Sequence, residues 1–112
     1  MGAIQSAESL SKAMDAFAEI SPHLTAAHIR TFLFVAERGI CTQKDLELGL
    51  GMINSGASRN VAFWVGNSKI GTSAPVPFLR SEVDPENRRF RLLSTTAKGR
   101  SFYKKISLIV SG

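Results

Sequence analysis

The chain has 112 residues, of which 44% are apolar, and its formal net charge at pH 7 is +5. This length supports a modest core and leaves little for a second one, so we expect residues 1–112 to form a single domain. No stretch approaches the roughly 20 apolar residues of a membrane-spanning helix. The start of the chain lacks the pattern of a secretory signal, and its one cysteine cannot form an internal disulfide. These features favour a cytoplasmic protein without a membrane partner.

The positive charge is concentrated in one part of the chain. Residues 80–105 hold eight basic and three acidic side chains, whereas the remainder holds six of each. Such a one-sided field attracts a polyanion. An acidic membrane surface is the weaker candidate, because no segment has the aromatic and lysine-rich character of an interfacial helix. Nucleic acid is therefore the predicted partner.

Two amphipathic helices are predicted in the first part of the chain. Residues 4–20 carry Leu10, Ala13, Met14, Phe17 and Ile20 at helical spacing, and this helix ends at Ser21-Pro22. A second helix from Ala26 to Arg38 is the predicted core helix, and Gly39 ends it. The apolar face of the first helix needs a partner.

A short helix and a longer one follow. Thr42-Gln-Lys-Asp45 has the pattern of a capping box, which predicts a short helix that stops near Gly51. After a tight turn, residues 53–65 are expected to form a helix that buries Ala57, Val61, Trp64 and Val65. Its opposite face then presents Asn54, Ser55, Ser58 and Arg59.

The polar face of residues 53–65 suits base recognition in a major groove. Asn pairs well with adenine, Arg pairs well with guanine, and Ser bonds a base or a phosphate. A structural interpretation is also open, because Asn54 or Ser55 at the start of a helix can be an ordinary N-cap.

Residues 66–77 are rich in Gly, Ser and Pro and carry only one charge, at Lys69, so we expect a loop outside the core. Residues 78–94 are expected to form a β-hairpin with strands over Leu79–Val83 and Arg89–Ser94. Asp84-Pro85 opens its turn as a type I turn.

The hairpin is rich in arginine. Arg88, Arg89 and Arg91 stand at the tip and on the returning strand, with Phe90 and Leu92 directed to the opposite face. A solvated hairpin with no binding role is the alternative for such a turn in isolation. Beyond the hairpin, Thr96 is the predicted cap of a last helix over residues 96–110, with Phe102, Ile106 and Ile109 on one stripe.

This order of elements is that of a winged helix-turn-helix, a mainly α fold with a small β-hairpin wing (α+β). In this fold the helix after the turn enters the major groove, and the wing contacts the minor groove or the backbone. The candidate DNA-binding residues are Asn54, Ser55, Ser58, Arg59, Arg88, Arg89 and Arg91.

Six short segments between Leu24 and Tyr103 add to this interpretation through their order and spacing. They are Leu24-Thr-Ala-Ala-His-Ile-Arg-Thr-Phe-Leu, Thr42-Gln-Lys-Asp-Leu, Leu50-Gly-Met, Ser58-Arg-Asn-Val61, Asp84-Pro-Glu-Asn-Arg-Arg89 and Thr96-Ala-Lys-Gly-Arg100. Together they resemble the MarR (multiple antibiotic resistance regulator) family of winged-helix transcription regulators.

The resemblance implies a homodimer that binds a pseudo-palindromic operator and is often released by a small ligand or by cysteine oxidation. It implies dimerisation through residues 1–20 and 96–110, a recognition helix at 53–65 and a wing over 78–94. The wing arginine is then Arg89, with Arg88 beside it. The sequence leaves the effector open.

Three features depart from the family pattern. Asn87 stands where the family commonly has an aspartate that pairs with the wing arginine. Residues 66–77 are an insertion, and the last helix is short, which implies a smaller dimer interface and a reduced pocket between subunits.

Other chemistry is sparse. Cys41 lies outside the first helix, where redox-sensing members of the family carry their cysteine, and we expect it to be a packing residue. His23 and His28 lack companions at metal-ligand spacing. The sequence therefore indicates no catalytic residues, no metal and no cofactor.

A protein-interaction winged helix that binds part of the transcription machinery is the alternative function. The polar, small-residue face of 53–65 favours DNA, whereas the uncharged insertion and Asn87 favour a protein partner.

Overall fold

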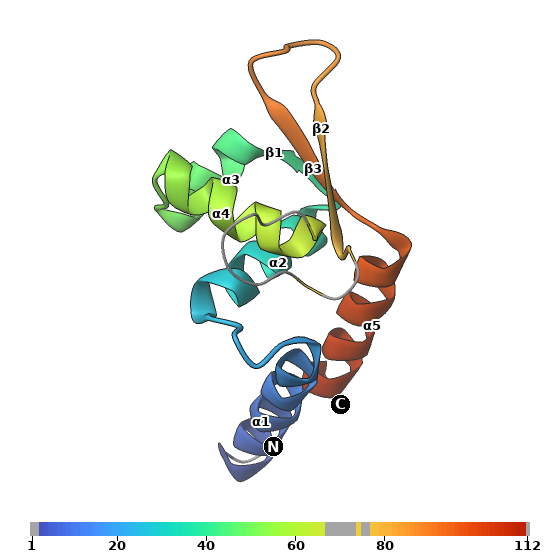
Figure 1. The fold of residues 1–112 in the computed structure, drawn as a ribbon. Helices are drawn as coiled ribbons and strands as arrows, with labels where there is room; N and C mark the ends of the chain where they lie inside the picture. The colour runs from blue at the N-terminus through green and yellow to red at the C-terminus, as the bar shows by residue number, and fades with distance from the viewer. Residues whose placement is uncertain (1–2, 67–73, 75–76, 112) are drawn as a thin grey trace.

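In the part of the chain that the computed structural model describes, residues 3–66, 74 and 77–111, five helices pack at the base of one small antiparallel sheet, whose hairpin projects away from them (Figure 1). The elements are α1 (Ala3–Ile20), α2 (Ala26–Arg38), β1 (Ile40–Thr42), α3 (Gln43–Leu50), α4 (Asn54–Val65), β2 (Leu79–Val83), β3 (Arg91–Thr95) and α5 (Ala97–Ser111). The predicted mainly α fold with a β wing is confirmed, and its order is that of a winged helix-turn-helix.

An aromatic cluster joins the helices. The ring of Phe32 in α2 lies 5.0 Å from the ring of Trp64 in α4, and Phe17 in α1 lies 5.0 Å from Phe102 in α5. The indole Nε1–H of Trp64 donates to the backbone oxygen of His28 at 2.7 Å, so burial leaves this polar group satisfied. Phe78, just before the hairpin, contacts Phe32 and Phe102 edge to face. The cluster therefore fixes α4 and the base of the hairpin to one core.

The predicted limits of the middle helices agree with the structure. Thr42 and Asp45 form the predicted capping box, with Asp45 N–H donating to Thr42 Oγ1 at 3.0 Å and Thr42 N–H to Asp45 Oδ2 at 3.0 Å. Gly39 and Gly51 end α2 and α3 with positive φ angles of 81° and 65°, where a residue without a Cβ is favoured.

The structure corrects the prediction for α4 in two ways. The N-cap is Ile53, which makes no side-chain cap bond, so the interpretation of Asn54 or Ser55 as the N-cap is wrong. Phe63 is buried, whereas Val65, which was predicted to be buried, is only half-buried. The reason is tertiary, because the ring of His28 stacks on Phe63 at 4.2 Å from the neighbouring helix.

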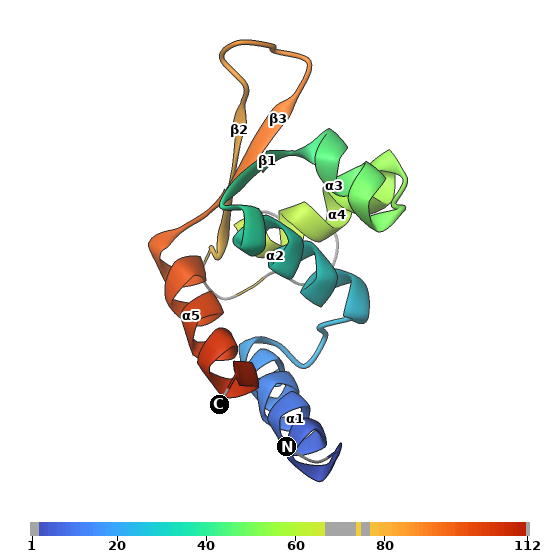
Figure 2. The same ribbon diagram turned by 180° about the vertical axis from the view of Figure 1, so that it is seen from behind.

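The sheet has one more strand than the sequence predicted. β1 pairs antiparallel with β3, with Cys41 opposite Leu93, and the strand order is β1-β3-β2. A strand of three residues shows no alternation that a sequence pattern could reveal. β1 ties the returning strand of the hairpin to the start of α3, as the view from behind shows (Figure 2).

The returning strand begins at Arg91, two residues later than predicted, and continues to Thr95. The difference arises because the Phe90 N–H donates to the Asn87 oxygen at 3.0 Å, which places Arg88 and Arg89 in a turn. Phe90 therefore lies at the tip and is 38% exposed, so its predicted place on the opposite strand face is wrong.

Thr96 caps α5 as predicted, since its Oγ1 accepts from the Gly99 N–H at 3.1 Å and its hydroxyl donates to the Pro77 oxygen at 2.8 Å. A Cβ on Gly99 would collide with the backbone oxygen of Phe78. The Thr-x-Lys-Gly pattern thus has a physical cause, because only a glycine lets α5 approach the start of the hairpin this closely.

Most of residues 66–77 lie outside the described residues. Ala74 is described, and its N–H donates to the Phe63 oxygen at 3.0 Å. Ala74 is 5% exposed and belongs to the core, so the expectation that the loop makes no part of the core is wrong at this residue.

α1 and α5 pack side by side at the end of the molecule opposite the hairpin tip (Figures 1 and 2). Ala13 and Phe17 of the predicted stripe are buried, but Leu10 and Met14 remain 61% and 44% exposed. Leu108 and Val110 of α5 are also exposed. Among the described residues, no helix is both long and apolar enough to cross a membrane.

Candidate nucleic-acid interface

The outer face of α4 carries the predicted polar set. Asn54, Ser55, Ser58 and Arg59 are all exposed, whereas Ala57 and Val61 between them are buried. α4 has no acidic side chain. The helix therefore offers hydrogen-bonding groups and one cation to a ligand, and its inner face holds it in place through Trp64.

Two of these side chains form hydrogen bonds with side chains of α3. The Asn54 Nδ2 group donates to Glu47 Oε2 at 3.0 Å, and Gln43 Nε2 donates to Ser58 Oγ at 3.0 Å. Gln43 and Glu47 lie one turn apart on α3, and Asn54 and Ser58 lie one turn apart on α4. The two helices are thus linked by two parallel polar contacts along the face that the sequence assigns to DNA.

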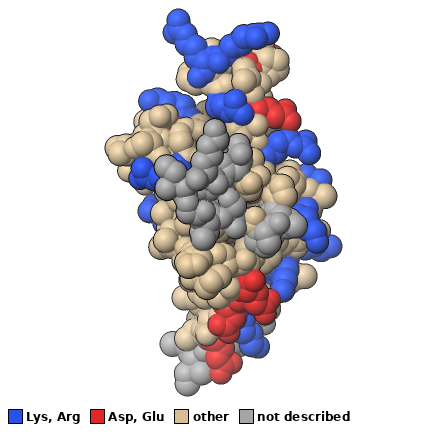
Figure 3. Space-filling view, viewed as in Figure 1, with Lys and Arg blue, Asp and Glu red and all other residues tan. Residues whose placement is uncertain are grey.

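The tip of the hairpin presents Arg88 and Arg89. Both are exposed, and neither side chain makes a hydrogen bond or ion pair within the described part of the chain. The backbone of the tip is well defined, because Asp84 Oδ1 accepts from the Glu86 N–H at 2.9 Å and Asn87 Oδ1 accepts from the Arg89 N–H at 3.2 Å. Asn87 therefore shapes the turn, a role that the sequence did not predict for it. Figure 3 shows the blue side chains at this tip.

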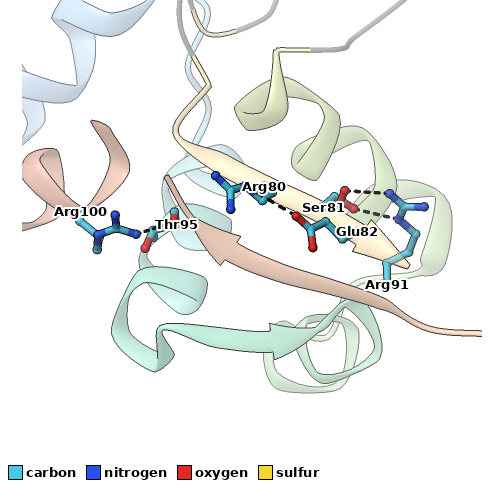
Figure 4. Close-up of polar contacts among 6 residues, drawn as sticks. All are labelled: Arg80, Ser81, Glu82, Arg91, Thr95 and Arg100. Carbon is cyan, nitrogen blue, oxygen red and sulfur yellow. Dashed lines mark hydrogen bonds and ion pairs between the residues drawn. The ribbon is translucent and has the colours of Figure 1, made fainter. Parts of the chain in front are cut away.

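Arg91 has a different environment from the two tip arginines. Its Nε donates to Ser81 Oγ at 2.9 Å and its Nη2 to the Ser81 backbone oxygen at 2.9 Å (Figure 4). These bonds cross from β3 to β2, so Arg91 braces the hairpin while its side chain stays exposed. The sequence grouped Arg88, Arg89 and Arg91 together, and the structure separates Arg91 from the tip.

A hollow of about 300 Å³ lies between α4 and the hairpin. Its lining includes Ser58, Val61, Ala62 and Val65 of α4 and Ser81 and Arg91 of the hairpin. Gln43 of α3 also lines it. The polar face of α4 and the hairpin are therefore separated by a partly apolar surface.

The charge on the surface is unevenly distributed. Basic side chains gather at the hairpin tip and along α5, which carries Lys98, Arg100, Lys104 and Lys105 (Figure 3). Acidic side chains gather at the far end over α1, which carries Glu8, Asp15 and Glu19 (Figure 3). The field over the hairpin tip and α5 suits a polyanion.

The cysteine and histidines do not form a reactive site. Burial is the main cause that raises the pKa of Cys41 to about 11; nearby Asp45 adds to the rise, and Arg38 partly opposes it. A thiol with such a pKa is not a thiolate at neutral pH, and Cys41 is buried in the core as predicted. Among the residues that the structure describes, no three His, Cys, Asp or Glu side chains come together as a metal site.

The sequence did not single out Gln43, Glu47 or Ile53. Ile53 is 73% exposed at the start of α4, and Gln43 and Glu47 contact the predicted recognition residues directly. The spacing of four residues places Gln43 and Glu47 on the same face of α3. Whether that face contacts α4 depends on the angle between α3 and α4, which no local sequence pattern predicts.

Comparison with known proteins shows what the fold resembles. No family model matches the sequence, and no curated protein matches it significantly. Among solved structures, the chain is similar to a variant of MarR from E. coli complexed with operator DNA, with a TM-score of 0.63 and 17% identity over 91% of this chain and 68% of that one. It is similar to RV1404 from Mycobacterium tuberculosis, with a TM-score of 0.68 and 20% identity over 91% and 63% of the two chains.

A third similar structure is BpsR of Bordetella bronchiseptica, described with 6-hydroxynicotinic acid as a regulator of its DNA binding, with a TM-score of 0.60 and 17% identity over 92% and 73% of the two chains. The winged helix-turn-helix of this chain is thus the fold of MarR-type regulators, as the sequence motifs indicated.

Proposed function

We propose that this protein is a cytoplasmic, sequence-specific regulator of transcription that binds double-stranded DNA as a homodimer on a pseudo-palindromic operator. In this proposal, α4 enters the major groove with Asn54, Ser55, Ser58 and Arg59. The wing, with Arg88, Arg89 and Arg91, holds the flanking backbone or minor groove.

The observation that carries the proposal is the exposed polar face of α4 beside an exposed, basic hairpin tip. The core fixes α4 from its inner side through Trp64, and the same core fixes the base of the hairpin through Phe78. α4 has no acidic side chain, and the hairpin tip is cationic. Because the shared core holds both in place, together they suit binding to the negatively charged DNA duplex. A similar structure holds operator DNA, which supports this use of the fold.

Exposed apolar side chains support the homodimer. Leu10, Met14, Leu108 and Val110 are each at least 44% exposed and lie on the adjacent helices α1 and α5. A two-fold pairing of these helices would cover them and would set two copies of α4 for two half-sites.

Selection of bound sequences from random duplex DNA tests the proposal. We expect an enriched palindrome whose half-sites are separated by about one helical turn or a multiple of it. Binding without any enriched sequence would contradict base recognition. Absence of duplex binding, together with capture of a component of the transcription machinery, would instead support the protein-interaction alternative.

Sedimentation tests the dimer. A Leu10→Glu/Leu108→Glu variant should sediment as a monomer at concentrations where the unaltered chain is a dimer, because it places charges in the apolar contact. Leu48→Glu is the matched control, since Leu48 on α3 is 73% exposed and lies away from α1 and α5. A dimer that survives the double change would rule out this interface.

A further inference from the structure

The contact between Glu47 and Asn54 restricts one recognition side chain before any DNA arrives. Asn54 is exposed, Glu47 is half-buried, and the Asn54 Nδ2 group lies 3.0 Å from Glu47 Oε2. A carboxylate only accepts hydrogen bonds. The amide of Asn54 must therefore present its NH₂ group to Glu47, because the reversed orientation would place its oxygen against a carboxylate oxygen.

This orientation leaves a defined set of groups for a base. One hydrogen of the amide NH₂ lies on the same side as the amide oxygen, and the other points away from it. When the hydrogen that points away bonds to Glu47, the oxygen and the remaining hydrogen form a free acceptor and donor side by side. That pair matches the N6 donor and N7 acceptor that adenine presents in the major groove.

The backbone that carries Glu47 is held firmly. A Cβ on Gly49 would collide with the Phe34 ring, so α3 packs directly on α2 beside Glu47. The backbone oxygen of Glu47 accepts from the Met52 N–H at 3.0 Å, and the Thr42 capping box fixes the start of α3. The backbone that carries Glu47 is therefore fixed relative to α2, and its carboxylate is positioned by its own side-chain torsions and by the bond to Asn54.

A second contact repeats the arrangement one turn further on. Gln43 Nε2 donates to Ser58 Oγ at 3.0 Å, so the lone pairs and the hydroxyl hydrogen of Ser58 have a preferred direction as well. Both contacts join α3 to the outer face of α4. These two hydrogen bonds indicate that α3 orients side chains on the outer face of α4, in addition to supporting the turn between α3 and α4.

The arrangement has an electrostatic cost. Glu47 brings a negative charge next to the surface that we assign to a polyanion, which weakens binding to every duplex alike. The charge is consistent with a function in selectivity, because orientation of the amide raises discrimination between bases while the charge lowers affinity in general.

We propose that Glu47 is a positioning residue for base recognition, which holds the amide of Asn54 in the orientation that suits adenine. This inference rests on the proposed function. A well-placed bidentate contact discriminates by about 5- to 150-fold against the wrong base. Loss of the fixed orientation should remove most of that factor at one base pair of the half-site and leave the others unchanged.

The experiment compares Glu47→Gln, Asn54→Ala and the double variant on the selected operator and on duplexes with single base-pair changes. Glutamine can donate or accept, so it permits both orientations of Asn54. We expect Glu47→Gln to lower discrimination about 5-fold or more at the same base pair that Asn54→Ala affects, with no further loss in the double variant. Binding to random duplex should rise slightly.

Glu19→Gln is the matched control, because it removes the same charge from the exposed surface of α1 at the opposite end of the molecule. It should leave every base preference intact. Full discrimination in Glu47→Gln at the pair that Asn54→Ala affects would overturn the inference, as would a loss at a different pair. Failure of the unaltered chain to enrich any sequence would overturn the proposed function and this inference with it.

Spectroscopy on the free protein tests the orientation without DNA. In the unaltered chain, the two side-chain amide protons of Asn54 should have well-separated resonances that move when Glu47 is protonated. Glu47→Gln should abolish that dependence on pH and Glu19→Gln should retain it. Amide resonances that ignore the ionisation of Glu47 would overturn the inference even if Glu47→Gln folded poorly.

Discussion

The two surfaces that we assign to DNA differ in how their side chains are held. On α4, Asn54 and Ser58 each bond to a side chain of α3. At the hairpin tip, Arg88 and Arg89 have a shaped backbone but side chains with no partner in the described part of the chain. Base recognition requires fixed geometry, whereas a phosphate can be held by a flexible cation. The contrast supports our proposal that α4 recognises bases and the wing attaches to the backbone.

The recognition helix and the hairpin tip should also differ in how much they contribute to the stability of the fold. This is the largest effect that we predict. Trp64→Ala should destabilise the fold by about 3–5 kcal/mol, because Trp64 is 0% exposed and lies in the aromatic cluster beneath the recognition face. It also loses its bond to the His28 oxygen. Chemical denaturation measures the change. Arg88→Ala/Arg89→Ala should stay within about 0.5 kcal/mol of the unaltered chain, and equal losses in the two variants would erase the contrast.

Arg59 tests recognition by α4. Arg59→Ala should cost about 1–3 kcal/mol on the preferred operator and little on random DNA, because this exposed arginine is the one cation on α4. Binding assays on both duplexes at two salt concentrations measure it. The same loss on both duplexes would show that α4 only attaches to the backbone.

The wing arginines test attachment. Arg88→Ala and Arg89→Ala should each weaken binding to all duplexes alike and reduce the slope of log K against log salt by about 1 per lost phosphate contact. The base preference should not change. Arg91→Ala is an informative comparison, since Arg91 also bonds to Ser81 across the hairpin. Unchanged binding in the Arg88→Ala/Arg89→Ala double variant would remove the wing from the DNA.

The smallest expected effect concerns pH and the support of α4. Burial lowers the pKa of His28, whose ring stacks on Phe63 of α4 and whose Nδ1 accepts from the Thr25 N–H. The folded state therefore binds this proton less readily than the unfolded chain. The stability that His28 contributes is complete above its unfolded pKa of 6.5 and is lost as the pH falls through the lower folded value.

The measurement is denaturation between about pH 7.5 and pH 5.5. His28→Gln should lose less stability over this range than the unaltered chain, because glutamine at this position can still complete a capping box without titrating. His23→Gln is the control, since His23 is exposed. Identical pH dependence in the unaltered chain and His28→Gln would show that His28 does not couple α4 to pH.

The sequence by itself determined the elements whose causes are local. Helix α2 was predicted with its observed limits because Gly39 ends it, and α3 because Thr42 and Asp45 cap each other over three residues. The order of elements then implied the winged helix, and the exposed set on α4 followed from the helical period alone. Capping, glycine and periodicity act within a few residues, so a single chain segment contains their full cause.

Tertiary structure decided what depends on distant partners. β1 exists because β3 pairs with it, Phe63 is buried because His28 covers it, and Ala74 joins the core through the Phe63 oxygen. The environments of Arg91 and Asn54 were equally hidden, since Ser81 and Glu47 meet them only after the hairpin closes and α3 packs against α4. A residue's type states which bonds its side chain can form, but the folded backbone selects the partner that comes within about 3 Å.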